Sequence, residues 1–327
     1  MAIGSDLVSI IVPAYQAERH LEECICSLLG QTYRAVEIIV VDDGSTDGTS
    51  AIVSRMANSD DRLRLVKQEN RGVSSARNHG IAESRGSYLM FVDADDWIEP
   101  FAVESLLSEI KSNGTDAVFC SQYYDGSGVL QASETSVPQS ASISSSVLLN
   151  YQLDFRFIAS PCFCLVRRTV LDCCEFPEDV YMLEDWYFNV QLLRSSDSVS
   201  VINRAYYHYR FTRGSSSHSP LNDKKLSCRL IPNRVVLLLG LQGDEASTVR
   251  LRLNVALIRH LLIVAAASGF DCDCCCKKMA SWARSTLGEA FASPDLPLKL
   301  KSYVFLGSVS PHLFAFFFKL KRKAHHD

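Results

Sequence analysis

Two carboxylates separated by one residue, Asp93 and Asp95, form the clearest chemical feature of this 327-residue sequence. Residues two apart in an extended segment project to one side, so both acids can address one ligand while Ala94 faces away. Mg²⁺ and Mn²⁺ prefer oxygen and are held by one or two carboxylates plus substrate phosphates. The spacing therefore indicates a divalent-cation site that a diphosphate would complete. The alternative is an acidic turn, Asp93 to Asp96, that caps the helix expected after Pro100.

Segments of β-branched or aromatic residues, nearly free of charge, alternate with segments of helical spacing in the first part of the chain. Continuous apolar runs of this kind suit parallel strands that are covered on both faces. The expected strands are 8–12, 36–41, 62–67 and 88–92, and the expected helices are 21–29, 51–56 and 73–84. The alternation predicts an α/β fold with a mostly parallel, doubly wound, Rossmann-like sheet.

The ends of the expected strands are the places to look for a ligand site. In doubly wound sheets ligands bind outside the carboxyl ends of the strands, where helix N-termini favour phosphate. The first strand ends in Pro13-Ala14-Tyr15, and the second ends in Asp42-Asp43-Gly44-Ser45. Three strand ends therefore converge on acidic and aromatic groups. For Tyr15 the alternative is an aromatic residue of the core.

Four segments, in this order and spacing, resemble the family 2 glycosyltransferases, which have the GT-A fold. They are Val12 to Tyr15, Val41 to Asp47, Asn70 to Asn78, and Phe91 to Asp96. The last third of the chain carries no such signature. The resemblance implies an inverting transferase that takes a sugar from a nucleotide-sugar donor with the help of Mn²⁺ or Mg²⁺.

The same resemblance implies roles for single residues. Tyr15 would stack on the donor base, while Asp43 would accept a hydrogen bond from a ring N–H such as that of uracil. Asp93 would contact the ribose, and Arg77 would add positive charge near the diphosphate. For Arg77 the alternative is a surface ion pair with a nearby acid. The implied donor-binding set is Pro13, Ala14, Tyr15, Asp43, Arg71, Arg77, Asp93 and Ala94, and the implied metal ligands are Asp95 and Asp93.

A second acidic pair, Glu184-Asp185, follows further along the chain. Sugar transfer with inversion needs a base that takes the proton of the acceptor hydroxyl. The pair resembles the family's acidic residues at the start of a helix beside the acceptor cleft, which implies that Asp185 is the base and Glu184 the second choice. Alternatively, both acids favour a first helical turn.

The segment from Tyr207 to Arg210 and the glycine at 214 are similar to the family's mobile loop after the base. By that similarity His208 would touch metal or phosphate, and Arg210 or Arg213 would reach the diphosphate. A tyrosine-rich strand with a packed histidine explains the first part equally well.

The chain is expected to contain a GT-A catalytic domain, 1–219, and a helical region, 220–327. The catalytic domain comprises a donor half, 1–120, and an acceptor half, 121–219, in which a Ser- and Gly-rich stretch, 125–146, is expected at the surface. Hydrophobic residues at 47%, charged residues at 21% and a net charge of -4 fit a globular protein and give no reason to expect nucleic acid as a partner.

The first residues lack the basic start and apolar stretch of a signal peptide, which predicts a cytoplasmic protein with its twelve cysteines reduced. Cys272 and Cys275 have the spacing of a zinc half-site, but the sequence contains no matching second half. Residues 303–318 are apolar but too short to span a bilayer. Because lysines flank them, the stretch 298–323 is either a helix on an anionic membrane surface or a core-packing helix with a basic end.

Two other functions compete with sugar transfer. A nucleotidyltransferase would need a glycine-rich loop after the first strand, and residues 12–17 contain no glycine. A degenerate donor-binding or scaffold protein at the membrane would not need every acidic position, yet each is filled. The family resemblance therefore implies transfer from a nucleotide-sugar, with UDP as the expected carrier, to a hydroxyl of a glycan or lipid-linked saccharide at the cytoplasmic face of the membrane. The sugar and the acceptor depend on residues 121–161 and are not specified.

Overall fold

The computed structural model describes residues 6–125, 139–155, 160–210, 219–312 and 314. Contacts divide the chain into two compact units. The first, here called the sheet unit, comprises residues 1–152, 156–178 and 185–211. The second, the helical unit, comprises residues 153–155, 179–184 and 212–327. The division into domains after residue 219 stays a prediction.

Within the described residues, a nine-stranded sheet with the order β3-β2-β1-β4-β8-β6-β9-β5 organises the sheet unit, and β7 pairs with β9 beside this path. Strands β1 to β4 pair in parallel, as do β6 and β9, whereas β5, β7 and β8 pair antiparallel. The α/β fold class predicted from the sequence is confirmed, and its parallel part is centred on β1. The strands are β1 Val8–Ala14, β2 Val36–Asp42, β3 Leu63–Lys67, β4 Tyr88–Phe91, β5 Trp97–Ile98, β6 Ala117–Asp125, β7 Ser140–Ser144, β8 Cys164–Arg167 and β9 Ser198–Arg210.

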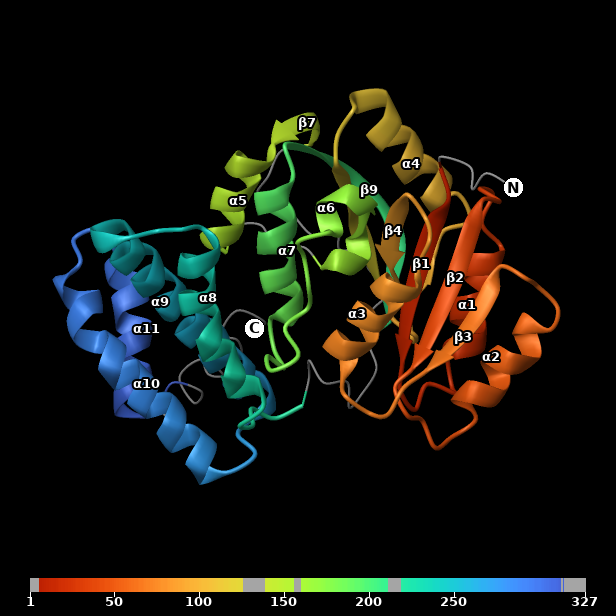
Figure 1. Ribbon diagram of the computed structural model, residues 1–327. Helices are drawn as coiled ribbons and strands as arrows, with labels where there is room; N and C mark the ends of the chain where they lie inside the picture. The colour runs from red at the N-terminus through yellow and green to blue at the C-terminus, as the bar shows by residue number, and fades with distance from the viewer. Residues whose placement is uncertain (1–5, 126–138, 156–159, 211–218, 313, 315–327) are drawn as a thin grey trace, which may run out of the picture. The chain divides into compact units, whose positions relative to one another are not determined.

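Helices cover both faces of the parallel strands: Figure 1 shows α3 on one side and α1 and α2 on the other. Helix α3 packs against β2 through Ala76, which lies in one buried cluster with Ile39 and Val41. The stretch 125–146, expected at the surface, contributes the largely exposed strand β7 and runs partly outside the described residues. The helices are α1 Leu21–Leu29, α2 Thr49–Ala57, α3 Val73–Glu83, α4 Ala102–Asn113, α5 Ser145–Leu153, α6 Arg168–Leu171 and α7 Glu184–Ser195, with a 3₁₀ turn η1 at Pro161–Phe163.

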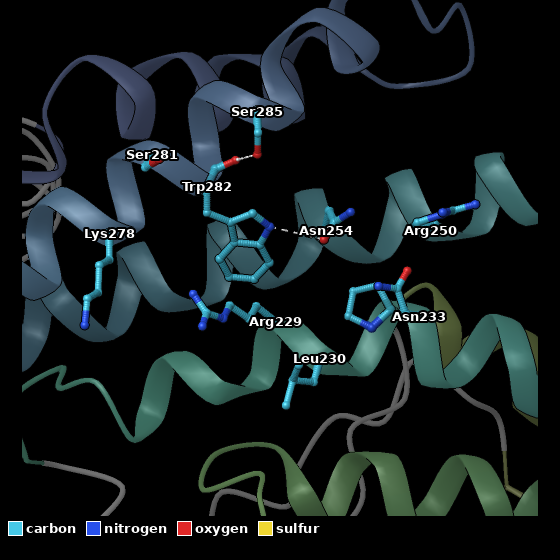
Figure 2. A pocket seen from close by; sticks show the side chains of 10 residues that line it. Arg229, Leu230, Asn233, Arg250, Asn254, Lys278, Ser281, Trp282 and Ser285 are labelled. Atoms are coloured by element: carbon cyan, nitrogen blue, oxygen red, sulfur yellow. Dashed lines mark hydrogen bonds between the residues drawn. The ribbon is translucent and has the colours of Figure 1, made fainter.

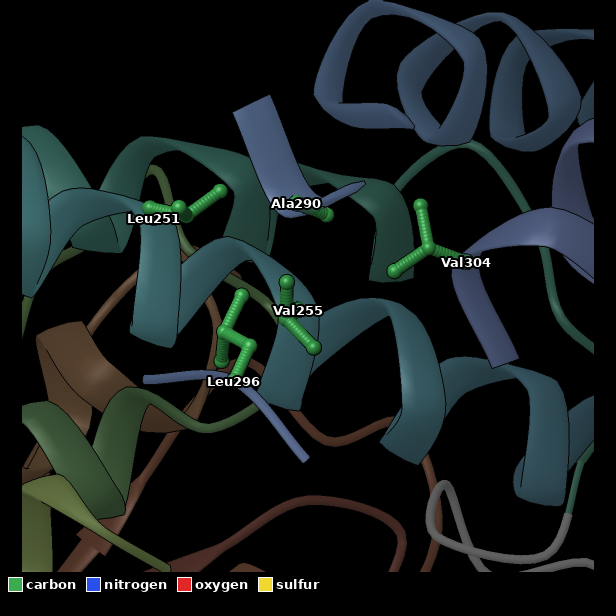
Figure 3. Packing of buried hydrophobic residues seen from close by; sticks show 5 residues of the cluster. All are labelled: Leu251, Val255, Ala290, Leu296 and Val304. Carbon is green, nitrogen blue, oxygen red and sulfur yellow. The ribbon is translucent and has the colours of Figure 1, made fainter. Parts of the chain in front are cut away.

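The helical unit is held by its own apolar cluster, drawn in Figure 3, of Leu251, Val255, Ala290, Leu296 and Val304. Its elements are η3 Lys225–Leu230, α8 Ile231–Leu238, α9 Gly243–Ser268, α10 Asp273–Ala292 and α11 Leu298–Val309. Among the described helices α9 alone is long and apolar enough to cross a membrane, with a mean hydropathy of 1.5. Half of its apolar stretch is buried in this unit, and the central helix of a bundle has the same signature.

The C-terminal stretch 298–323 begins as part of this core. Val304 of α11 is fully buried, and Lys301 Nζ donates to the Ser293 carbonyl (2.7 Å) near the end of α10. These contacts fit the core-packing alternative for α11. Most of the expected basic end, 315–323, lies outside the described residues, so membrane binding through it stays a prediction.

The cysteines depart from expectation at the start of α10. Cys272 and Cys274 are joined by a disulfide, so the prediction of reduced thiols is wrong for this pair, whereas the other ten cysteines are free. The extended backbone of Cys272, which precedes the helix, brings its sulfur beside that of Cys274 in the first turn. Cys275 Sγ lies 3.3 Å from Cys272 Sγ and 3.4 Å from Asp223 Oδ1.

Candidate active site

The loops that follow β1 and β2 are tied together and present Tyr15 to solvent. The Gln16 backbone N–H donates to Ser45 Oγ (3.0 Å), and its side-chain amide donates to Thr46 Oγ1 (2.9 Å). Tyr15 is 53% exposed, so the alternative of a core aromatic is wrong. An exposed ring on a fixed loop has a face available for stacking.

Asp43, which directly follows β2, is buried and holds the loop before α3. Its Oδ1 accepts from the backbone N–H of Arg71 (2.8 Å) and its Oδ2 from that of Gly72 (2.8 Å). Gly72 has a φ of 93°, and Gly44 has a φ of 77° with Asn70 N only 2.9 Å from where a Cβ would stand. Both positions therefore suit glycine. Asp43 thus has a structural task in addition to the donor contact predicted for it.

The acidic turn, Asp93 to Asp96, follows β4 and uses its carboxylates separately. Asp93 Oδ1 pairs with the guanidinium of Arg77 (2.9 Å), whose side chain is only 6% exposed, and Asp95 is half-buried. The residue before α4, Phe101, makes no side-chain capping bond, so the helix-capping alternative is wrong. Arg77 does pair with a nearby acid, but in the interior and not at the surface.

Asp96 is the member of this turn whose role the sequence did not reveal. It is 1% exposed and accepts from Tyr207 Oη (2.6 Å) and from the Arg210 backbone N–H (2.7 Å). Burial, followed by the negative charge of Asp93, raises the pKa of Asp96 to about 8. Asp96 therefore anchors β9 beneath the turn and leaves Asp93 and Asp95 as its half-buried carboxylates.

Asp185 lies near the acidic turn because aromatic side chains fix the start of α7. Phe176 stacks on Phe188 (3.9 Å between centroids) and meets Phe91 of β4 edge-on (5.3 Å). The Arg77 guanidinium lies 5.1 Å from the centre of the Phe176 ring. Burial raises the pKa of Asp185, the charge of Arg77 opposes this rise, and the charge of Asp93 adds to it. Arg77 is thus an electrostatic neighbour of both predicted carboxylates.

Strand β9 brings two predicted donor-binding residues to the same region. Arg210 Nε donates to the Asp95 carbonyl (2.9 Å), and its terminal nitrogen pairs with Glu23 (2.6 Å). His208 Nε2 lies 2.8 Å from Glu99 Oε1, and its ring stacks on Trp97 (4.7 Å). Arg213 and the glycine at 214 lie outside the described residues.

The remaining predicted residues occupy the margins of this site. Arg71 is exposed and pairs with Glu178 (2.8 Å), while Pro13 and Ala14 end β1 and are buried. Glu184 begins α7, directly before Asp185. Two non-glycine residues with positive φ, Gln16 (50°) and Leu183 (63°), adjoin Tyr15 and Glu184. Backbone with positive φ at non-glycine residues often occurs at functional sites, but the residue types Gln and Leu do not predict this conformation.

A sheet whose parallel strands are followed by Tyr15, Asp43 and the acidic turn has the arrangement expected of a GT-A type fold. Residues 9–174 match the sequence profile described as "Glycosyl transferase family 2", and the chain belongs to this family. The "Uncharacterized glycosyltransferase EpsJ" of Bacillus subtilis is 36% identical over 65% of this chain and 64% of its own length. "Glycosyltransferase GlyA" of Streptococcus pneumoniae is 32% identical over 65% of this chain but only 32% of its own length. The match therefore spans less than two thirds of each relative.

Solved structures share the fold at low sequence identity. The S. aureus TarS fragment 1–349, crystallised with UDP-GlcNAc, superposes with a TM-score of 0.70 at 23% identity, covering 97% of this chain and 92% of that one. A mannosyltransferase of Pyrobaculum calidifontis, in complex with GDP-Man and Mn²⁺, gives 0.52 at 18% identity, covering 92% and 86%. The GT-A fold predicted from the sequence is confirmed.

Proposed function

We propose that this chain is an inverting, metal-dependent glycosyltransferase that moves a sugar from a UDP-sugar to a hydroxyl of a glycan or lipid-linked saccharide. The observation that carries the proposal is the link from Asp93 through the buried Arg77 to Asp185. It supports the proposal because the carboxylate proposed for the donor side and the carboxylate proposed as the base both interact with the Arg77 guanidinium.

Asp185 acts as the base. Burial raises the pKa of its carboxyl, and a carboxylate of higher pKa is a stronger base towards the acceptor hydroxyl. The carboxylate takes the proton of the acceptor hydroxyl, whose oxygen forms the new bond to the anomeric carbon. The bond between that carbon and the diphosphate oxygen breaks, and the nucleoside diphosphate leaves with its electron pair.

The half-buried carboxylates of Asp93 and Asp95 fit Mn²⁺ or Mg²⁺, since both ions favour oxygen ligands and tolerate a site completed by phosphate. A bound cation would neutralise the negative charge that develops on the departing diphosphate. Because Arg77 already offsets one charge of the turn, the protein can hold these acids together before the donor arrives.

Tyr15 and Asp43 are proposed to receive the nucleobase. Tyr15 offers an exposed ring, and the Asp43 carboxylate lies at the end of the neighbouring strand. UDP is favoured because the TarS structures that share the fold were crystallised with UDP and with UDP-GlcNAc. Arg210, which is hydrogen-bonded to Asp95, would face the diphosphate. His208 stacks on Trp97 and would thereby support Arg210.

A growing glycan is the proposed acceptor, and the cytoplasmic side of the membrane the proposed location. Chondroitin synthase of Escherichia coli, a relative that builds such a polymer by name, is 39% identical over 33% of this chain. Residues 315–327 are proposed to provide peripheral attachment. A chain shortened to residue 314 keeps the core helix α11, and it should lose binding to anionic vesicles. Vesicle binding that survives the truncation would exclude this attachment.

The test of the function is nucleotide release from UDP-, GDP- and dTDP-sugars with Mn²⁺. The wild type should release UDP from a UDP-sugar, while chelation or Asp95→Asn should reduce release by about 10²-fold or more. Asp61→Asn is a matched control, because Asp61 is an exposed acid outside the site. Absence of turnover with every donor, or indifference to both perturbations, would leave a binding or scaffold role.

A further inference from the structure

The helical unit contains a second concave surface that the proposed chemistry does not use. A pocket of about 600 Å³ opens between η3 and α8 on one side and α9 and α10 on the other (Figure 2). A depression of about 650 Å³ continues it along α9 and α10 and shares Arg250, Asn254, Trp282 and Ser285 with it. We call the two together the α9–α10 groove.

Positive charge is concentrated at one end of this groove. Arg229, Arg250 and Lys278 line the first pocket, and no Asp or Glu lines it. The guanidinium groups of Arg229 and Arg250 form no salt bridge with any residue in the described part of the chain, and both residues are exposed. Lys278 pairs with Asp223. The two arginines therefore contribute charge that a bound anion could use.

An aromatic surface with a fixed orientation lies between these cations. Trp282 is half-buried, and its Nε1–H donates to Asn254 Oδ1 (3.2 Å). Figure 2 shows the indole extending from α10 toward Arg229 and Asn254. A held indole offers an apolar face to a sugar ring, and the neighbouring Ser281, Ser285 and Asn233 offer hydroxyl and amide groups for sugar hydroxyls.

The far end of the groove is less positive, since Glu289 and Asp295 line it together with Arg252. A polyanion with uniform charge would meet these acids, whereas a saccharide with intermittent charge would place neutral sugar units there. The combination of cations at one end, an indole in the middle and a mixed end thus favours a charged saccharide over a simple anion.

We propose that the α9–α10 groove binds a saccharide segment that carries a carboxylate or a phosphate, and that this segment belongs to the acceptor glycan. Arg229 and Arg250 recognise the anionic group, and Trp282 stacks on a neighbouring ring. Its assignment as acceptor rests on the proposed function, but binding to the groove does not depend on donor turnover.

Titration calorimetry on the full chain at low salt tests the groove with four probes. They are a tetrasaccharide containing glucuronate, a short saccharide phosphate, neutral chitotetraose and inorganic phosphate. One or both charged saccharides should bind at least about tenfold more tightly than chitotetraose and inorganic phosphate. The first two probes distinguish a carboxylate from a phosphate. Equal binding of chitotetraose would overturn the role of charge, and equal binding of inorganic phosphate would overturn saccharide recognition.

Variants locate the binding. The double variant Arg229→Ala, Arg250→Ala should weaken the affinity for the charged saccharide about tenfold or more. The control double variant Lys277→Ala, Lys299→Ala removes the same charge from exposed positions outside the groove, and it should change this affinity less than twofold. Trp282→Phe should retain most binding and Trp282→Ala should lose it. Equal losses in both double variants would reduce the effect to net charge and overturn the site. Because these titrations contain no donor, they stand even if nucleotide release fails.

Discussion

Charged side chains are paired in the acidic turn of the sheet unit. In the α9–α10 groove of the helical unit, two arginines form no salt bridge among the described residues. In the turn, Asp93 is paired with a buried arginine, and Asp96 is hydrogen-bonded to β9. In the groove, Arg229 and Arg250 are exposed and form no salt bridge within the described residues. The first site is arranged before any ligand binds, and the second gains its partners from the ligand.

This difference fits the roles proposed for the two sites. Groups that stabilise a charge developing during a reaction are most effective when fixed in advance and shielded from water. A surface that holds a polymer and lets it move gains from weak, exposed contacts that salt can screen. Substitutions in the turn should therefore alter catalysis and stability, whereas substitutions in the groove should alter binding alone.

The largest effect is expected for Asp185→Asn. Loss of a general base should lower sugar transfer by about 10²- to 10⁴-fold while leaving the affinity for UDP within about threefold. Steady-state transfer and UDP titration measure the two quantities. Glu184→Gln is the neighbouring comparison and should retain most activity. If UDP affinity falls in parallel with transfer in a folded Asp185→Asn protein, Asp185 belongs to the donor site.

Arg77→Ala comes next, and Arg71→Ala is its matched control. Removing the buried guanidinium leaves Asp93 unpaired and should cost about 2 kcal/mol of unfolding free energy, less than a fully buried pair because the Asp93 side chain is 33% exposed. The exposed pair of Arg71 with Glu178 should contribute below about 1 kcal/mol. Urea unfolding at neutral pH compares the two. Similar losses would break the distinction between interior and surface ion pairs.

Asp96 should make stability depend on pH. Its pKa, about 8 in the folded protein, lies above the ordinary value of 3.8, so the native state holds a proton that the unfolded chain releases. The stability from this group is complete below pH 4, and it declines as the pH rises towards 8. In Asp96→Asn the thermal unfolding midpoint should depend less on pH between pH 5 and 8.5 than it does in the wild type. An unchanged slope would show that Asp96 is ionised in the fold.

The smallest effect is expected in the groove. Arg229→Ala with Arg250→Ala should change the unfolding free energy by less than about 0.5 kcal/mol, because exposed arginines that form no salt bridge among the described residues contribute little to the fold. The same urea experiment as for Arg77→Ala measures it. A loss as large as that of Arg77→Ala would mean that these arginines support the helical unit and are not reserved for a ligand.

The sequence predicted the structure of the first half of the chain better than that of the second half. Apolar segments predicted β1, β2 and β4. Acidic residues after β2 and β4 were expected to lie near one another, because the carboxyl ends of parallel strands meet at one edge of the sheet. Nothing in the pattern distinguished Asp96 from its neighbours, since adjacent acids look alike until the fold buries one of them. For residues 207–210 the sequence left a mobile loop and a tyrosine-rich strand open. They form the end of β9, where the Arg210 N–H donates to Asp96 and His208 pairs with Trp97 of β5.

The groove was beyond sequence prediction for a different reason. Arg229, Arg250 and Trp282 come from three elements, η3, α9 and α10, and their separations along the chain carry no period. Packing around Val255 and Ala290 brings α9 and α10 together.

The central claim, that the acidic turn holds the donor diphosphate through a cation, is tested most directly by titrating UDP with and without Mn²⁺. Wild type should bind UDP at least about tenfold more tightly with Mn²⁺, whereas Asp95→Asn should gain no affinity from the metal. The account would be contradicted if Mn²⁺ did not change the UDP affinity of the wild type, or if Mn²⁺ increased the UDP affinity of Asp95→Asn as much as that of the wild type.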